Sequence, residues 1–217
     1  MATADRAARR VGAQTSKTRE HLLDCVERIM VAKGYPGVSY RAVASAAGVT
    51  PGLVQYYFPT LDDLFVAAIR RRGEQNLERV TAALEARADE PLRVLWEFSQ
   101  EESTAALTTE YLALGNHRAS IRSEIADVTE RVRAVQLRAV EAKYGKDGVG
   151  ETALTTGAFL FLLTGIPRLI RIEQGVGART AHADALEALE AYLDELEPPS
   201  RRRSGKQRDR SPARRSA

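Results

Sequence analysis

The sequence predicts an all-α protein of about nine helices in two domains, and three observations support this prediction. Ala, Leu, Glu and Arg, which favour helices, are abundant among the 217 residues. Apolar residues recur at helical spacing along most of residues 16–196. Capping residues and breaks at Gly or Pro divide this pattern into segments of helical length. A chain of this length can also bury a sizeable core.

The clearest local signals lie in residues 39–58, SYRAVASAAGVTPGLVQYYF. Ser39 is a good N-cap for a first short helix, and Gly48 ends that helix as a C-cap. Thr50 then caps a second helix that has Pro51 at its first position. The second helix directs three side chains towards a core: Val54, Tyr57 and Phe58. The segment is therefore predicted to be a helix–turn–helix, a motif that lays its second helix in the major groove of DNA.

The same residues resemble a known family. The pattern A-x-x-A-G-V-T-P-G-x-V-x-Y-Y-F-P at residues 44–59, preceded by a long helix, is similar to the DNA-binding domain of the TetR family of transcriptional regulators. The resemblance covers roughly residues 15–65 and is specific in spacing and residue type. It implies an all-helical homodimer with an N-terminal three-helix domain that binds a double-stranded DNA operator. It also implies a C-terminal domain that binds a small ligand, and this ligand changes the affinity for DNA.

Base contacts are expected from the start of the second helix of the motif. Pro51 and Gly52 let the backbone approach the DNA closely, and Leu53 can contact a thymine methyl group. Gln55 can pair with adenine or contact a phosphate. Arg41 matches a family position that can contact guanine. Four apolar residues of the motif are expected to be structural: Val43, Val49, Val54 and Phe58.

Phosphate contacts, which position a protein without specifying sequence, are expected around the same helix. The hydroxyl groups suited to phosphates are those of Tyr40, Thr50, Tyr56 and Tyr57, and Ser39 completes the DNA-binding set. Lys17 and Arg19 are predicted in the first turn of the preceding helix, where backbone N–H groups also bind anions. Many family members have Tyr where Gln55 stands and Lys where Leu61 stands, so this chain departs from the family pattern at two phosphate contacts.

Breaks in the pattern divide the chain into four parts. These are a flexible N-terminal arm at 1–14, the helix–turn–helix domain at 15–60, a ligand-binding and dimerisation domain at 61–197 and a disordered basic tail at 198–217. The long helices are predicted at about 16–33, 62–87, 91–102, 104–117, 120–144, 151–173 and 181–196. The run Arg70–Arg71–Arg72 is expected to form a solvated helix face. The tail either attracts DNA without sequence preference or only adds solubility.

The ligand site implied by the resemblance is a pocket between the helices that span residues 62–173. The side chains predicted to line it are Trp96, Tyr111, Asn116, His117, Phe159 and Leu162. Ordinary core packing is the alternative for each, because aromatic residues at helical spacing usually fill cores.

The helices predicted at 151–173 and 181–196 are expected to form the homodimer interface. The first is apolar nearly all round, and small residues at Gly157, Ala158 and Gly165 allow another helix to approach closely. Together the two helices resemble the intersubunit four-helix bundle of the family. The alternative is that they close the core of a monomer.

Charge is distributed unevenly along the chain, whose net charge is +3. Residues 1–60 carry eight Lys or Arg and four Asp or Glu, residues 61–197 carry 16 and 24, and residues 198–217 carry eight and one. A basic head on an acidic body is typical of a protein that contacts phosphates at one end only.

Motifs of enzymes, metal sites and membrane proteins are missing from the sequence. It has no Gly-rich phosphate loop and no G-x-S-x-G, H-E-x-x-H, C-x-x-C or E-x-x-H pattern. His21 and Cys25 lie one helical turn apart, but two ligands do not make a metal site, so neither a metal nor a cofactor is expected. The single cysteine suits the reducing cytoplasm, and no apolar run is long enough to span a bilayer.

We therefore expect a cytoplasmic, non-enzymatic, sequence-specific transcriptional regulator. The family resemblance favours a repressor that a small hydrophobic ligand releases from its operator. A DNA-binding dimer without a small-molecule effector is the first alternative, and a helical-bundle enzyme is the second.

Overall fold

The structure, a computed structural model, describes residues 2–198, with the side chains of residues 17–101 and 107–198. The regular elements within this part are all helical, which confirms the predicted fold class. In chain order they are α1 (Ala2–Lys33), the 3-10 helix η1 (Tyr35–Gly37), α2 (Tyr40–Ala47), α3 (Pro51–Tyr57), α4 (Leu61–Ala86), α5 (Pro91–Ser99), α6 (Glu102–Gly115), α7 (Ala119–Tyr144), α8 (Thr156–Gly175) and α9 (His182–Leu196). Residues 199–217 of the predicted basic tail lie outside the described residues.

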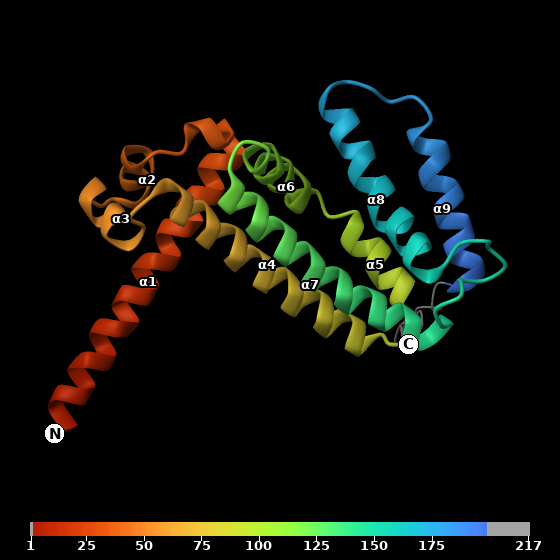
Figure 1. The fold of residues 1–217 in the computed structure, drawn as a ribbon, viewed down its shortest axis with the longest axis horizontal. Helices are drawn as coiled ribbons and strands as arrows, with labels where there is room; N and C mark the ends of the chain where they lie inside the picture. Colours follow the sequence, from red (N-terminus) through yellow and green to blue (C-terminus); the bar gives the residue numbers. More distant parts are fainter. Residues whose placement is uncertain (1, 199–217) are drawn as a thin grey trace, which may run out of the picture.

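The helices form an elongated molecule with a head at one end and a body at the other (Figure 1). The head consists of α1–α3, and the body consists of α4–α9. α4 starts at the head and runs side by side with α7 through the body. α8 and α9 form a pair at the end of the molecule far from α2 and α3 (Figure 1). The predicted DNA-contacting helix and the predicted dimerisation helices are thus well separated.

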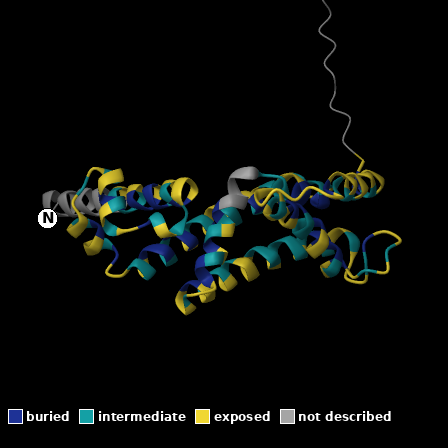
Figure 2. Ribbon diagram, turned by 90° about the horizontal axis from the view of Figure 1, so that it is seen from above, coloured by how far each residue is buried: buried dark blue, intermediate teal, exposed yellow. Residues whose placement is uncertain are grey.

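Apolar side chains form two clusters along this length. The head cluster joins α1–α3 to the start of α4 and to α6, and it includes Leu22, Val43, Val54, Phe58 and Phe65. The body cluster joins α4, α5, α7, α8 and α9, and it includes Leu92, Leu95, Trp96, Phe159 and Leu193. Figure 2 shows buried residues where helices face one another and exposed residues on the outer faces. Each half of the molecule therefore has its own packed core.

A glycine sets the close approach of the two longest body helices. A Cβ atom placed on Gly73 of α4 would lie 2.4 Å from Cγ1 of Val128 on α7, far inside van der Waals contact. Any larger residue at position 73 would push α4 and α7 apart. Because α4 begins in the head, this contact also fixes where the head sits relative to the body.

The helix ends of the head form as the local sequence predicts. The Ser39 hydroxyl oxygen accepts a hydrogen bond from the Ala42 N–H group (3.2 Å), and Thr50 caps α3 by accepting one from the Leu53 N–H group (3.4 Å). Gly48 ends α2 at φ 69°, in the left-handed region that glycine adopts without strain. These caps hold the helix–turn–helix in place through short-range contacts.

Two helix starts differ most from the sequence prediction. α1 begins at Ala2, not near residue 16, since the Ala- and Arg-rich run that precedes residue 16 itself favours helix. α8 begins at Thr156, not near residue 151, because Thr155 caps it by accepting a hydrogen bond from the Ala158 N–H group (3.3 Å). The Thr156 hydroxyl donates to the Gly145 carbonyl (2.7 Å) and anchors the start of the helix to the end of α7.

The prediction that residues 70–72 form a solvated face is wrong for Arg71. Its side chain is only 11% exposed, and its guanidinium contacts three carboxylates on α1, those of Glu20 (3.2 Å), Asp24 (2.8 Å) and Glu27 (2.7 Å). Burial acts to lower the pKa of Arg71, but the hydrogen bond to Glu27 and the other acidic partners outweigh it and raise the pKa. Arg71 therefore clamps α4 onto α1.

Candidate DNA interface and effector cavity

The apolar side chains of the helix–turn–helix point into the core of the head, and Arg19 of α1 covers one of them. Val43 and Val54 have no exposed surface, and Phe58 is 2% exposed. Val49 is half-buried in the turn and packs against the same core. The structural roles predicted for these residues are therefore confirmed. The guanidinium of Arg19 lies 5.3 Å from the centre of the Phe58 ring and covers its edge of the core.

The start of α3 and one side of α2 form an exposed polar surface. Arg41, Pro51, Gly52 and Gln55 are all exposed, and Leu53 is half-buried. A Cβ atom at Gly52 would meet no protein atom within 4 Å, so packing within the chain does not require glycine there. What glycine provides is an uncovered backbone at the start of a helix, which an external partner can approach closely. Four of the five predicted base-contacting residues are thus accessible to a partner, and Leu53 is partly so.

The predicted phosphate-contacting hydroxyl groups differ in their surroundings. Ser39 and Thr50 use their hydroxyl oxygens as helix caps, which leaves each hydroxyl hydrogen available for a phosphate. Tyr56 is 76% exposed, and its ring meets the half-buried Tyr57 ring edge to face at 5.5 Å. Ser39, Thr50 and Tyr56 are thus exposed, whereas the half-buried ring of Tyr57 packs against Tyr56.

Tyr40 is committed to the fold and not to a partner. Its hydroxyl group lies 3.0 Å from the Phe58 carbonyl and 2.9 Å from the Pro59 carbonyl, and it donates its only proton there. Burial, and then the negative charge of Asp63, raise the pKa of Tyr40 and keep it protonated. Its predicted phosphate contact is therefore replaced by a structural one that ties α2 to the α3–α4 turn.

Lys17 also differs from its predicted setting. It is exposed, but it lies within α1 and not in the first turn, because the helix starts at Ala2. Its backbone N–H group belongs to the helix interior, so only the ammonium group can contact a phosphate. Arg19 is paired with Glu20 (3.7 Å), in addition to its contact with Phe58.

A cavity of about 200 Å³, partly open to solvent, lies between the five helices α4–α8 of the body. Many of the side chains that line it are apolar, among them Ile69, Val80, Leu95, Phe98, Ile125, Val128 and Val132. Four arginines also line it: Arg72, Arg133, Arg168 and Arg171. The same wall includes Tyr111 and one carboxylate, Glu101. The cavity lies where the resemblance implies a ligand pocket.

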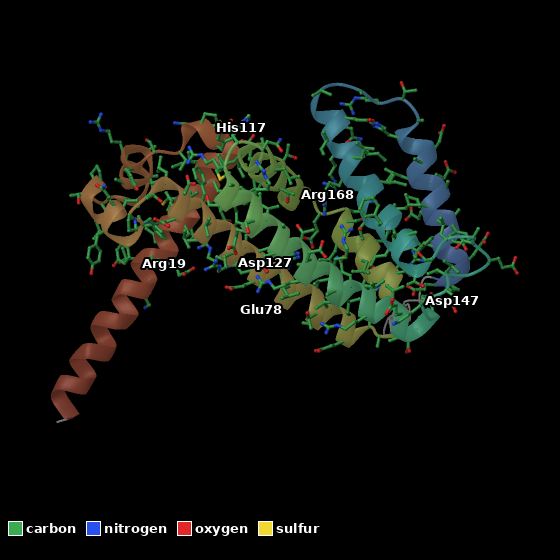
Figure 3. The ribbon with its side chains drawn as sticks, in the orientation of Figure 1. Arg19, Glu78, His117, Asp127, Asp147 and Arg168 are labelled. Atoms are coloured by element: carbon green, nitrogen blue, oxygen red, sulfur yellow. The ribbon has the colours of Figure 1, made fainter. Side chains whose placement is uncertain are left out.

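Of the six side chains predicted to line this pocket, only Tyr111 does so. Trp96 and Phe159 are buried in the body core, where the Phe159 ring packs against Tyr192 (5.7 Å between ring centres). Leu162 lies on the outer face of α8. Asn116 and His117 are exposed at the corner between α6 and α7, where Figure 3 labels His117. These five side chains do not line this cavity, because helix packing turns Trp96 and Phe159 into the core and leaves the other three exposed.

Direct contacts join the head to the body beside the cavity. Glu110 of α6 accepts a hydrogen bond from the Tyr35 N–H group of η1 at 2.7 Å. Glu110 is the neighbour of Tyr111, which lines the cavity, so one helix touches both the cavity and the head. Within the body, the start of α4 is held to the start of α7, because the Asp62 carboxylate pairs with Arg118 and accepts a hydrogen bond from the Ser120 hydroxyl (2.7 Å).

Two kinds of site do not appear within the part of the chain that the structure describes. Its His, Cys, Asp and Glu side chains form no group of three or more that could hold a metal ion. None of its helices combines the length and the apolar character needed to cross a membrane.

Comparison with known proteins matches this architecture. The family described as "Bacterial regulatory proteins, tetR family" matches residues 22–68, which include α2 and α3. The HTH-type transcriptional regulator AcrR of Shigella flexneri is 27% identical over 139 residues, which cover 62% of this chain and 64% of that protein. The chain thus spans just under two thirds of this curated relative.

Solved structures extend the likeness to the whole fold. The multidrug binding protein EbrR, solved in complex with ethidium, is 30% identical, has a TM-score of 0.57 and covers 81% of this chain and 98% of its own. A transcriptional regulator from Saccharomonospora viridis, solved with choline, has a TM-score of 0.69 at 20% identity and covers 82% of this chain and 96% of its own. The helix–turn–helix, the all-helical body and these matches agree with one another. We conclude that the chain belongs to the TetR family of transcriptional regulators.

Proposed function

We propose that this protein is a homodimeric repressor that binds a pseudo-palindromic operator through α3 and leaves it when a small ligand enters the body cavity. The observation that carries the proposal is the exposed start of α3, where Pro51, Gly52 and Gln55 stand clear of a sealed apolar core. A helix presented in this way fits the major groove of DNA, and the contacts of Gln55 and Arg41 are of the kind that distinguish bases. Such a protein acts in the cytoplasm, where the DNA is.

An apolar stripe on α8 supports the homodimer. Leu162, Leu169, Ile172 and Val176 follow one another at helical spacing and are all exposed, Val176 by 83%. Gly165 falls in the same stripe, and a Cβ atom there would meet nothing within 4 Å, so a second helix can come close. Contiguous apolar surface of this kind marks an interaction site. A second copy of α8, together with α9, is the partner we propose for it.

The ligand response is proposed to pass through α6. Tyr111 lines the cavity, and its neighbour Glu110 holds the Tyr35 N–H group in the head. A ligand that displaces Tyr111 shifts Glu110, and the head then tilts relative to the body. The two recognition helices of the dimer must lie about 34–36 Å apart, or a multiple of this, to meet successive half-sites. A ligand that favours the tilted state therefore weakens operator binding.

The DNA interface can be tested by selecting binding sites from random DNA and measuring affinity by fluorescence anisotropy. Arg41→Ala and Gln55→Ala are each expected to cost about 1–3 kcal/mol on the selected site and far less on random DNA. Arg131→Ala, which removes an arginine of α7 that pairs with Asp127, is the matched control and leaves both affinities unchanged. Equal losses on selected and random DNA would contradict base recognition by these two residues.

The ligand response needs a separate measurement. Small organic molecules are added to the protein–operator complex, and the anisotropy of the labelled DNA reports release. Release by at least one class of molecule is expected. If operator binding is tight and no class of ligand changes it, the protein is a DNA-binding dimer without a small-molecule effector.

A further inference from the structure

The cavity in the body carries an excess of positive charge. Its lining includes Arg72 from α4, Arg133 from α7, and Arg168 and Arg171 from α8. The one carboxylate in the lining, Glu101, is paired with Arg79, which is not part of the lining (2.5 Å). The negative charge of Glu101 is therefore already balanced from outside the cavity. None of the four arginines is fully buried, so their charges persist at the wall of a cavity that is partly open to solvent.

Of the four arginines that line the cavity, Arg168 is the one for which the structure gives no hydrogen-bond, ion-pair or ring partner among the described residues. Arg171 donates a hydrogen bond to the Gln100 carbonyl, and the Arg133 guanidinium lies over the Phe161 ring at 4.9 Å. The surrounding protein desolvates Arg168 and the charge of Arg133 repels it, and both effects lower its pKa. It stays protonated, since arginine keeps its charge in proteins. Figure 3 labels it on the side of α8 that faces the rest of the body.

The accessibility of Arg168 is consistent with this setting. Arg168 is exposed in the single chain, although the protein around its guanidinium lowers its pKa. Both observations agree if the open surface lies in a recess and not on an outer face. A ligand that enters the cavity can then reach the charged group.

A second donor without a partner lies in the same wall. Tyr111 is 6% exposed, and its hydroxyl group has no hydrogen-bond partner among the described residues. A buried hydroxyl group without a partner costs free energy, so a ligand atom that accepts a hydrogen bond from it would be stabilised. Burial, and then the charge of Glu27, raise the pKa of Tyr111, so its hydroxyl group remains a donor.

We propose that the cavity binds a compact organic anion, with an apolar body and a carboxylate or other acidic group that Arg168, Arg133 and Tyr111 receive. The apolar side chains of α4, α5 and α7 contact the body of the ligand, and the donors of α6–α8 contact its acidic group. A volume of about 200 Å³ suits a molecule of one or two fused rings and not a drug-sized one. The regulatory meaning of this site depends on the function proposed above.

This ligand class differs from the ligands of structural relatives. EbrR has been solved with ethidium, proflavin and malachite green, which are cationic dyes. A cation would meet Arg168 and Arg133 without an unpaired carboxylate to balance it among the residues that line this cavity. The difference in charge therefore predicts that this chain rejects such dyes.

Three matched ligands test the charge preference on the full-length dimer. 2-Naphthoate, 2-naphthamide and 2-naphthylmethylammonium share one ring system and differ in charge, and calorimetry gives their affinities. Naphthoate is expected to bind about tenfold to a hundredfold more tightly than the amide, because the acid gains charge-assisted hydrogen bonds. The ammonium compound is expected to bind more weakly than the amide. Equal affinities for the acid and the amide, or no binding of naphthoate at millimolar concentration, overturn the proposal.

Variants identify the residue responsible. Arg168→Gln is expected to lower naphthoate affinity about tenfold and to leave the amide unchanged. Arg168→Glu should reverse the preference towards the ammonium compound, a result that a folding defect cannot produce. Arg131→Gln removes the same charge from α7 outside the cavity and serves as the control, with no change expected. Equal losses from Arg168→Gln and Arg131→Gln overturn the assignment.

Operator binding measured with the same three ligands separates this proposal from the proposed function. If naphthoate binds selectively but operator affinity does not change, the anion site is supported and its proposed regulatory role is contradicted. Release of the operator by the amide or the ammonium compound as readily as by naphthoate would keep the regulatory role and overturn the anion site.

Discussion

The head and the body of this molecule each have a packed apolar core, but they place their functional side chains differently. In the head, apolar residues such as Val54 and Phe58 are buried and polar residues such as Gln55 are exposed, as in any stable small domain. In the body, arginines such as Arg168 line a cavity that is partly open to solvent, and apolar residues such as Leu169 and Val176 are exposed outside the core.

The difference shows where function has to be sought in each half. The head places its recognition residues on the surface of an ordinary core, so its function depends on the positions of a few exposed side chains. Outside its core, the body exposes an apolar stripe on α8 and collects positive charge around its cavity, and both are unfavourable for an isolated monomer. A ligand in the cavity and a second subunit on α8 would remove both costs.

The largest expected effect comes from the apolar stripe on α8. Leu169→Glu places a charge on a side chain that is 55% exposed in the monomer, so the fold of the monomer should persist and the dimer should dissociate. Operator affinity is expected to fall towards the nonspecific level, about a thousandfold or more, because one head meets only one half-site. Analytical ultracentrifugation measures the dissociation, and anisotropy measures the loss of DNA binding.

A matched charge elsewhere controls for the effect of charge alone. Ala82→Glu adds a carboxylate to an exposed position of α4 and should leave the dimer and the operator affinity unchanged. A Leu169→Glu protein that stays dimeric would show that α8 is not the interface.

A second prediction compares two phenylalanines, one from each half. Phe58 is 2% exposed and Phe161 is 56% exposed. Phe58→Ala is expected to lower the free energy of unfolding by about 3–5 kcal/mol through loss of burial and creation of a cavity. Phe161→Ala should cost about 1 kcal/mol or less, the size of its contact with Arg133. Urea unfolding in the Leu169→Glu background measures both without a contribution from the dimer, and similar losses would contradict the comparison.

The sequence alone predicts most of the head because the signals there are local. Ser39, Gly48 and Thr50 each determine a helix end through contacts with residues at most four positions away. Their effects do not depend on how the rest of the chain packs. For the same reason the C-terminal ends of the long helices are close to prediction, and α7 ends at Tyr144 as expected.

The cavity could not be predicted in this way. Which of the 16 Lys and Arg residues between 61 and 197 point inward depends on how five helices cross, and no spacing along the chain reports it. Trp96 is a second example, because the sequence alone does not tell whether an aromatic residue lines a ligand pocket or packs in the core, as Trp96 does. Arg71 was expected in solvent, and only the position of α1 explains its three carboxylate partners.

The smallest expected effects separate two tyrosines within the head. Tyr40→Phe removes a hydroxyl group that donates to the Phe58 and Pro59 carbonyls, so the free energy of unfolding should fall by about 0.5–1.5 kcal/mol. Tyr56→Phe removes an exposed hydroxyl group and should leave stability unchanged. Its effect should appear on DNA instead, as a loss of about 1 kcal/mol on selected and random DNA alike, because a phosphate contact carries no base preference. Thermal unfolding and anisotropy on both proteins test the pair. Comparable DNA losses together with unchanged stability for Tyr40→Phe would return Tyr40 to the interface and show that the structural hydrogen bond does not prevent it from binding a phosphate.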